Sequence, residues 1–229
     1  MDESPTFNVF NNRLPAEIYQ YSLPHWFRPG TAIFVSFRTN DSLPKPVLQR
    51  MHRELLEWLE IRKLPVALAN SLIARRTAEQ EKLLESLQPD DRTNFHKLTA
   101  QLIHYSLDEC HGACPFRQPK LAEIVGKHIL HFDKIRYDVD CFVVMPNHVH
   151  AIIQFRQGFH LKQLGASWLQ LSARRINELL GTKGAVWQGE PFDHLIRSGR
   201  QFEYLRRYIT ENPLKAKLRP GEYLLYQRE

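Results

Sequence analysis

The sequence predicts an α+β fold, a ferredoxin-like split βαββαβ sandwich with an antiparallel sheet, a helical insertion and an added C-terminal helix. Two observations support this prediction. Runs rich in β-branched and aromatic residues alternate with runs whose apolar residues recur every three or four positions. Proline- and glycine-containing stretches separate these runs. The order is strand, helical block, helix, strand, strand, helix, strand, helix.

The first half of the chain contains one strand and a helical block. Residues 1–29 have scattered proline and aromatic residues without periodicity, and we expect a tail that lies on the domain. Residues 31–38, Thr-Ala-Ile-Phe-Val-Ser-Phe-Arg, predict the first strand. Residues 47–107 predict three helices, the second over 70–87 and the third over 92–107.

The second half supplies the remaining strands. Proline at the first position favours a helix over 119–134. Residues 136–145 and 148–155 predict two strands that form a hairpin, because the Pro-Asn pair between them suits a tight turn. The next helix is predicted over 160–180.

The C-terminal part is predicted to end in a helix. Residues 185–188 and 192–196 indicate a last strand or ribbon. A helix follows over 200–211 and is predicted to end before Pro213, because the residue preceding a proline disfavours the helical conformation.

Length and composition indicate an ordinary globular protein. The chain has 229 residues, enough for one well-packed domain, of which 43% are hydrophobic and 24% charged. No apolar run approaches the roughly 18 residues of a membrane helix, and the start, Met-Asp-Glu-Ser-Pro, lacks the layout of a secretion signal. We therefore expect a cytoplasmic protein without a membrane span.

The three cysteines are Cys110, Cys114 and Cys141, an odd number that favours a reducing compartment. Alternatively, Cys-His-Gly-Ala-Cys at 110–114 forms half of a zinc site, but no second Cys/His pair at zinc-ligand spacing follows.

Positive charge is concentrated in the second half of the chain. Residues 1–115 carry 13 Lys and Arg against 14 Asp and Glu, a net charge of −1, whereas residues 116–229 carry 18 against 11, a net charge of +7. This asymmetry favours a polyanionic ligand, and a solvated basic surface is the alternative.

Two histidines in the predicted hairpin are candidate metal ligands. His148 and His150 are separated by Val149. Because side chains alternate along a strand, both histidines point to one face about 7 Å apart, and Val149 points to the core. Two neutral imidazoles on one face can form half of a metal site, although such a pair can also be only a surface or core feature.

The last predicted helix carries Tyr204, Tyr208 and Asn212 at a spacing of four, which places them on one face. A phenol is a competent nucleophile toward a phosphodiester whose phosphate is polarised by a metal. An amide oxygen added to two imidazoles leaves open positions that suit Mg²⁺ or Mn²⁺. The structural alternatives are core tyrosines and a helix-end asparagine.

Four motifs together resemble one known family. They are Met-Pro-Asn-His-Val-His at 145–150, Trp-Gln at 187–188, Phe-Asp-His-Leu-Ile-Arg at 192–197, and Tyr-Ile-Thr-Glu-Asn-Pro-Leu-Lys-Ala at 208–216. Their order and separation resemble the HUH single-tyrosine transposases, and in particular the REP-associated tyrosine transposase branch. The resemblance covers roughly residues 30–40 and 105–218.

The resemblance implies a metal-dependent single-strand DNA endonuclease and strand transferase. His148 and His150 match the metal-binding pair, and Asn212 matches the third, helix-borne ligand. Tyr208 matches the nucleophile, which leaves a 5′-phosphotyrosine link and a free 3′-hydroxyl. Family substrates are hairpins of repetitive extragenic palindromes with flanking single-stranded DNA.

The order of the predicted elements indicates a domain organisation. We expect a single domain over 1–229, with an N-terminal tail (1–29), a helical insertion (47–115) and a catalytic core (116–218). Relatives include monomers and swapped homodimers, and both remain open for this chain.

Further residues are candidates for DNA contact or for auxiliary roles. Basic side chains of the second half can contact phosphates, and aromatic ones can stack on unpaired bases. The main candidates are Arg174, Arg175, Arg197, Arg206, Arg207, Lys215 and Trp187, with Trp168 and Phe192 as further stacking residues. His194 is a candidate for proton handling. Tyr204 is either a second nucleophile or a residue that packs or stacks.

Two other functions remain open. A non-catalytic relative that binds DNA or RNA hairpins through the basic face would need no metal. A hydrolase of a small phosphoester would use His148 and His150 without the tyrosine, but it would leave the basic half unexplained.

Overall fold

A computed structural model describes residues 6–10, 17–20, 24–72, 76–189 and 191–229 of the chain. The chain divides into two compact units. One unit combines Met1–Ser42 with Ala113–Glu229, and the other is Leu43–Gly112. Each unit is described by itself below.

The first unit contains a five-stranded sheet in which every pairing is antiparallel. Its strands, in the order β6-β3-β5-β4-β7, are Phe192–Leu195, Ala32–Arg38, His148–Phe155, Tyr137–Val144 and Leu224–Gln227. The first four follow the strand order of a split βαββαβ fold, which confirms the predicted α+β class.

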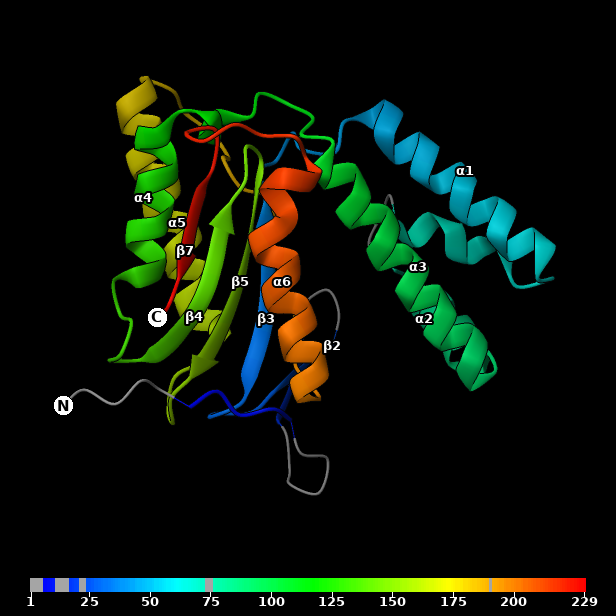
Figure 1. Cartoon of the computed structure of the whole chain (residues 1–229). Helices are drawn as coiled ribbons and strands as arrows, with labels where there is room; N and C mark the ends of the chain where they lie inside the picture. Colours follow the sequence, from blue (N-terminus) through cyan, green and yellow to red (C-terminus); the bar gives the residue numbers. More distant parts are fainter. Residues whose placement is uncertain (1–5, 11–16, 21–23, 73–75, 190) are drawn as a thin grey trace. The chain divides into compact units, whose positions relative to one another are not determined.

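Helices cover both faces of this sheet. On one face lie α4 (Pro119–Leu130) and α5 (Leu161–Leu180), and on the other lies α6 (Gly199–Lys215), as Figure 1 shows. The helix α6 packs against β4 and β5. The sheet thus separates two layers, and only the residues that face α6 can meet this helix.

Several short elements differ from the prediction. The predicted tail contains a paired strand couple, β1 (Glu17–Gln20) and β2 (Pro24–Phe27), while residues 1–5, 11–16 and 21–23 lie outside the described part. The edge strand β7 was not predicted. These four-residue strands are too short to show a reliable alternation of apolar and polar residues. Within 185–188, Trp187 forms only an isolated bridge with Thr39.

Two helix ends also differ from the prediction. The helix α4 ends at Leu130, four residues before the predicted end. The helix α6 continues through Pro213 to Lys215. A proline close to a helix end removes only one hydrogen bond, and the backbone N–H of Ala216 still donates to the carbonyl of Asn212 at 3.0 Å. The prediction that the helix ends before Pro213 was therefore wrong.

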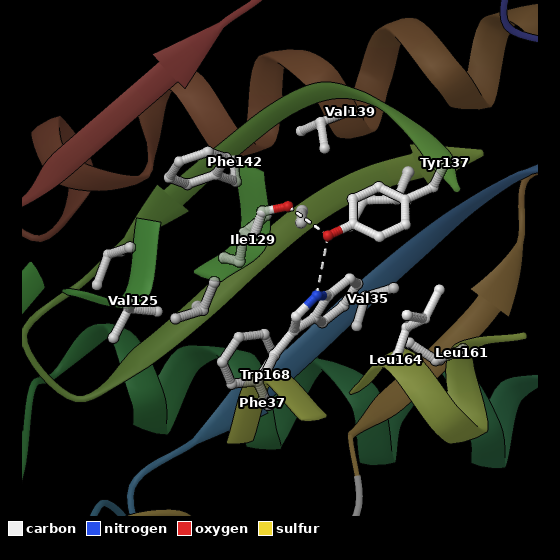
Figure 2. Packing of buried hydrophobic residues seen from close by; sticks show 14 of the residues in the cluster. Val35, Phe37, Val125, Ile129, Tyr137, Val139, Phe142, Leu161, Leu164 and Trp168 are labelled. Carbon is white, nitrogen blue, oxygen red and sulfur yellow. Dashed lines mark hydrogen bonds between the residues drawn. The ribbon is translucent and has the colours of Figure 1, made fainter. Parts of the chain in front are cut away.

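The main core lies between the sheet and α4 and α5. Inward-facing residues of the strands pack against apolar residues of both helices (Figure 2). The hydroxyl of Tyr137 donates to the carbonyl of Ile129 at 2.7 Å and accepts from the indole nitrogen of Trp168 at 3.0 Å. Buried polar atoms are costly unless they are hydrogen-bonded, so these contacts satisfy the phenol inside the core.

The burial of Tyr137 leads to a pH prediction. Burial raises the pKa of Tyr137 from 10.0 to about 12, although the hydrogen bond from Trp168 acts in the opposite direction. Between pH 10 and 12 the unfolded chain therefore ionises this phenol while the folded chain keeps it neutral. Stability should fall as pH rises through this window, by about 2–3 kcal/mol for this group.

The variant Tyr137→Phe tests this expectation. Below pH 10 it should be less stable than the parent protein by about 1–3 kcal/mol, because the hydrogen bonds of Trp168 and Ile129 to the phenol are lost. By pH 12 the difference should shrink, because the variant lacks the titrating group. Urea unfolding of both proteins at pH 9 and pH 11.5 measures the difference in unfolding free energy. If this difference is the same at both pH values, the raised pKa of Tyr137 is contradicted.

The second unit is helical and has its own core. Its elements are α1 (Lys45–Ile61), the 3₁₀ helix η1 (Val66–Leu72), α2 (Ala78–Ser86) and α3 (Pro89–Asp108). Buried residues of all four elements pack in two clusters within the unit. The unit begins and ends slightly earlier than the predicted 47–115 insertion.

The predicted helix over 70–87 is divided in the structure, and residues 73–75 lie outside the described part. The helix α2 begins after Thr77, whose side chain accepts from the backbone N–H of Gln80 at 3.2 Å. The Gln80 side chain accepts in turn from the Thr77 backbone N–H, which forms a capping box that defines a helix start.

No helix within the described ranges is long and apolar enough to span a membrane.

Candidate active site

His148 and His150 lie on the face of β5 that is covered by α6. Val149, between them, points to the opposite face and belongs to the main core. Both histidines have no exposed surface. Their ring centroids are 4.7 Å apart, and a ring nitrogen of one lies within 4.8 Å of a ring nitrogen of the other. The predicted same-face arrangement of the two imidazoles is confirmed.

The hairpin turn orients the first of these imidazoles. Nδ1 of His148 lies 2.8 Å from the side-chain oxygen of Asn147. An amide oxygen only accepts hydrogen bonds, so Nδ1 carries the proton and Nε2 presents a lone pair. The turn is held by a hydrogen bond from the Thr39 backbone N–H to the Asn147 carbonyl at 2.8 Å. In this tautomer Nε2 can bind a metal while Nδ1 keeps the ring oriented.

Tyr208 reaches the second imidazole from α6. Its hydroxyl oxygen lies 3.3 Å from Nε2 of His150, and the two ring centroids are 5.3 Å apart. The phenol and the histidine pair come from segments 58 residues apart in sequence. The fold therefore brings together the predicted nucleophile and the predicted metal pair.

Phe34 of β3 supports these rings and was not singled out from the sequence. Its ring stacks on His150 with centroids 5.3 Å apart, and it lies 6.4 Å from the ring of Tyr208. A phenylalanine in a predicted apolar strand is ordinary in sequence. Only the alternation with Ile33 and Val35, which face the main core, could have indicated that Phe34 faces the histidines.

Asn212 follows Tyr208 by one helical turn and is completely buried. The other buried residues of α6 are Leu205, Ile209 and Pro213. A helix advances about 100° per residue, so positions four apart drift by about 40°. This drift turns Asn212 inward and turns Tyr204 outward.

Tyr204 is 68% exposed. It is therefore not packed in the core, and its other predicted roles, as a stacking residue or a second nucleophile, stay predictions. The two imidazoles are nitrogen donors that could hold a metal ion. Asn212 as a third ligand, and Mg²⁺ or Mn²⁺ as the metal, stay predictions.

Arg206, a predicted DNA contact, meets a buried carboxylate of the fold. Its Nε lies 3.2 Å from a carboxylate oxygen of Asp140, which is buried in β4. Its Nη2 donates to the backbone carbonyl of Arg228 at 3.2 Å. The guanidinium is thus engaged in contacts within the fold.

Arg174 and Arg175 lie on α5, on the opposite face of the sheet from the histidines. Both pair with Glu178, at 3.0 and 3.2 Å. The sheet separates them from Tyr208, and their contact with DNA phosphates stays a prediction.

Trp187 is 7% exposed and belongs to the main core. Its ring stacks on Phe116 at a centroid distance of 5.0 Å, and its indole nitrogen donates to the Ser172 hydroxyl at 2.9 Å. Trp168 is buried in the same core. Either indole would have to leave the core to stack on a base, and the stacking role of both residues stays a prediction.

Three other predicted DNA contacts lie on α6 or directly before it. Arg197 and Arg207 are exposed. The Lys215 ammonium lies 5.6 Å from the centre of the Tyr208 ring and 3.4 Å from Glu211.

His194 lies on β6 and is half-buried. Its ring centroid is 5.3 Å from that of Phe34, and its Nε2 lies 3.4 Å from the amide nitrogen of Gln201. Phe192, on the same strand, is exposed and 5.8 Å from His194 between ring centroids. A stacking role for Phe192 is thus compatible with its exposure.

Comparison with known proteins gives little further information. No protein-family model and no curated protein matches the chain. One solved structure, described as "Structure of the REP associates tyrosine transposase bound to a REP hairpin", matches with a TM-score of 0.35 and 14% identity. The match covers 87% of this chain and 73% of the other. We infer nothing from a likeness of this size.

Proposed function

We propose that this protein is a metal-dependent single-strand DNA endonuclease and strand transferase that nicks hairpin-associated DNA through a 5′-phosphotyrosine intermediate. The observation that supports it most is the hydroxyl of Tyr208 at 3.3 Å from Nε2 of His150. A nucleophilic side chain, a pair of imidazoles and a buried amide are the parts that such a reaction needs. The HUH-type motifs of the sequence indicate the same chemistry.

The residues have separate roles in this proposal. Tyr208 attacks phosphorus, so that a bond from its phenolic oxygen to phosphorus forms and the bond to the 3′ oxygen breaks. The phenol's proton is transferred overall to the leaving 3′ oxygen, which becomes a hydroxyl. His148, His150 and Asn212 would hold the cation, which when bound polarises the phosphate as a Lewis acid. One phosphoester replaces another, so a 3′-hydroxyl can later reverse the step.

The charge distribution favours a polyanionic substrate such as DNA. The part of the chain that contains both histidines and Tyr208, residues 116–229, has a net charge of +7. Exposed Arg197 and Arg207 belong to the segment that carries Tyr208. Contacts of this kind to phosphates predict an affinity that falls steeply with salt.

The test uses oligonucleotides that contain a hairpin with single-stranded flanks. Each is labelled at the 5′ end or at the 3′ end and incubated with the protein and Mn²⁺ or Mg²⁺. A 5′-phosphotyrosine link predicts that the 3′ label becomes attached to protein on a denaturing gel, while the 5′ label is released with a free 3′-hydroxyl. EDTA should prevent both events.

Two outcomes would contradict the proposal. Binding without cleavage across a broad set of hairpins would favour the non-catalytic hairpin binder. Cleavage without a protein-linked strand would favour hydrolysis by the histidine pair alone.

A further inference from the structure

Asp140 lies at an irregularity of β4 opposite α6. The pairing of β4 with β5 shifts register between Val139 and Cys141, which leaves Asp140 as the extra residue of a β-bulge. A bulge changes the direction of a side chain and bends its strand. Val139 and Phe142 both remain in the main core. The bulge thus preserves the core on both sides while it frees Asp140 for another contact.

Arg206 of α6 and Arg228 near β7 meet this carboxylate region from two directions. Nε of Arg206 lies 3.2 Å from the Asp140 carboxylate, and its Nη2 donates to the Arg228 carbonyl at 3.2 Å. The backbone N–H of Arg228 donates to the Asp140 carbonyl at 2.8 Å. The Arg228 guanidinium donates to the Val139 carbonyl at 2.7 Å and lies 2.5 Å from Asp133. These contacts join β4, α6 and the segment after β7 into one network.

The network holds one flank of α6. A helix turns about 100° per residue, so Arg206 and Tyr208 project about 200° apart, from nearly opposite flanks. The Arg206 flank meets β4, and the Tyr208 flank meets His150 of β5. Rotation of α6 about its axis would move both side chains together. The contact with Asp140 therefore also sets the position of the Tyr208 hydroxyl.

Stability alone does not account for a charged pair at this place. Burial raises the pKa of the Asp140 carboxyl, and the charge of Arg206 only opposes this effect. Desolvation makes a buried ion pair a poor source of stability compared with apolar side chains of similar volume. The directional contact at this place is the hydrogen bond from Nη2 of Arg206 to the Arg228 carbonyl, since a guanidinium donates along fixed directions, and the ion pair with Asp140 adds an attraction at 3.2 Å.

We propose that Asp140, Arg206 and Arg228 are positioning residues that fix the rotation of α6 and so keep the Tyr208 hydroxyl beside His150. The kinetic consequence rests on the proposed function, whereas the effect on the position of Tyr208 does not. A displacement of a reacting group by about 1 Å can lower a rate about 100-fold.

The test compares Asp140→Asn and Arg206→Met with Asp138→Asn. Asp138 is a matched control, because it is equally buried on β4 and pairs with Arg156, at 2.8 Å, rather than with α6. The nuclear Overhauser effect between the labelled rings of Tyr208 and His150 reports the position of the phenol. Single-turnover adduct formation and DNA affinity are measured on the same proteins.

Asp140→Asn and Arg206→Met should weaken the Overhauser effect and slow adduct formation by about 10- to 100-fold, with DNA affinity within about twofold of the parent protein. Asp138→Asn should change neither readout. If either Asp140→Asn or Arg206→Met does not fold, the other variant is sufficient for the comparison with Asp138→Asn.

An unchanged Overhauser effect in folded Asp140→Asn or Arg206→Met would overturn the positioning role. An equal loss of the Overhauser effect in the control Asp138→Asn would also overturn it. A parent protein that forms no adduct, together with a lost Overhauser effect in Asp140→Asn, would instead reject the proposed function and retain the positioning role.

Discussion

Tyr208→Phe is expected to abolish the covalent protein–DNA adduct, with a rate at least about a thousandfold below that of the parent protein. The substitution removes the hydroxyl 3.3 Å from His150 and nothing else. The phenyl ring can keep its place beside His150 and Phe34, at centroid distances of 5.3 and 6.4 Å, so folding should be unaffected. Adduct yield with 3′-labelled hairpin DNA under single-turnover conditions measures the effect.

Tyr204→Phe is the matched control for this experiment. Tyr204 lies one turn earlier on the same helix but is 68% exposed. Its variant should form the adduct at the rate of the parent protein. Undiminished adduct in Tyr208→Phe would remove Tyr208 from its assigned role, and loss of the adduct in Tyr204→Phe alone would assign the nucleophile to Tyr204.

His148→Ala and His150→Ala are each expected to weaken Mn²⁺ binding by at least about tenfold and to prevent adduct formation. Both imidazoles lie on one face of β5 with their ring centroids 4.7 Å apart, and the hydrogen bond to Asn147 leaves Nε2 of His148 available as a donor to a metal. Calorimetric titration of the protein with Mn²⁺, without DNA, measures the binding independently of activity.

His128→Ala serves as the control for the histidine variants. His128 lies on α4, on the opposite face of the sheet, and its ring contacts the carbonyl of Ile124 at 2.7 Å. Its variant should bind Mn²⁺ as the parent protein does. Unchanged Mn²⁺ affinity in both His148→Ala and His150→Ala, with the fold verified by circular dichroism, would exclude the histidine pair as the metal site.

The histidine pair could be predicted from the sequence because its signal is local. Alternation along a single strand places His148 and His150 on one face and Val149 on the other, whatever surrounds the strand. The pairing of the two hairpin strands could also be predicted from a local signal, since a tight turn fixes the register of the residues next to it. The strand order of the βαββαβ core also follows from the succession of elements, because few topologies accept that succession.

The roles of individual basic and aromatic side chains could not be predicted in this way. Arg206 and Arg207 are adjacent in sequence, yet Arg206 meets a buried carboxylate and Arg207 is exposed. The carboxylate belongs to Asp140, 66 positions away, at a bulge that no local pattern indicates. Trp187 is likewise assigned to the core only by its contacts with Phe116 and Ser172.

The sequence by itself determined the α+β class, the element order of the βαββαβ core and the shared face of His148 and His150, because periodicity and turn chemistry act over a few residues. Only the tertiary structure decided that Tyr208 reaches His150, that Tyr204 turns toward solvent, and that Arg206 is engaged by Asp140. These outcomes depend on how α6 is rotated over the sheet. That rotation is set by contacts between residues far apart in the chain, which the periodicity of one helix does not specify.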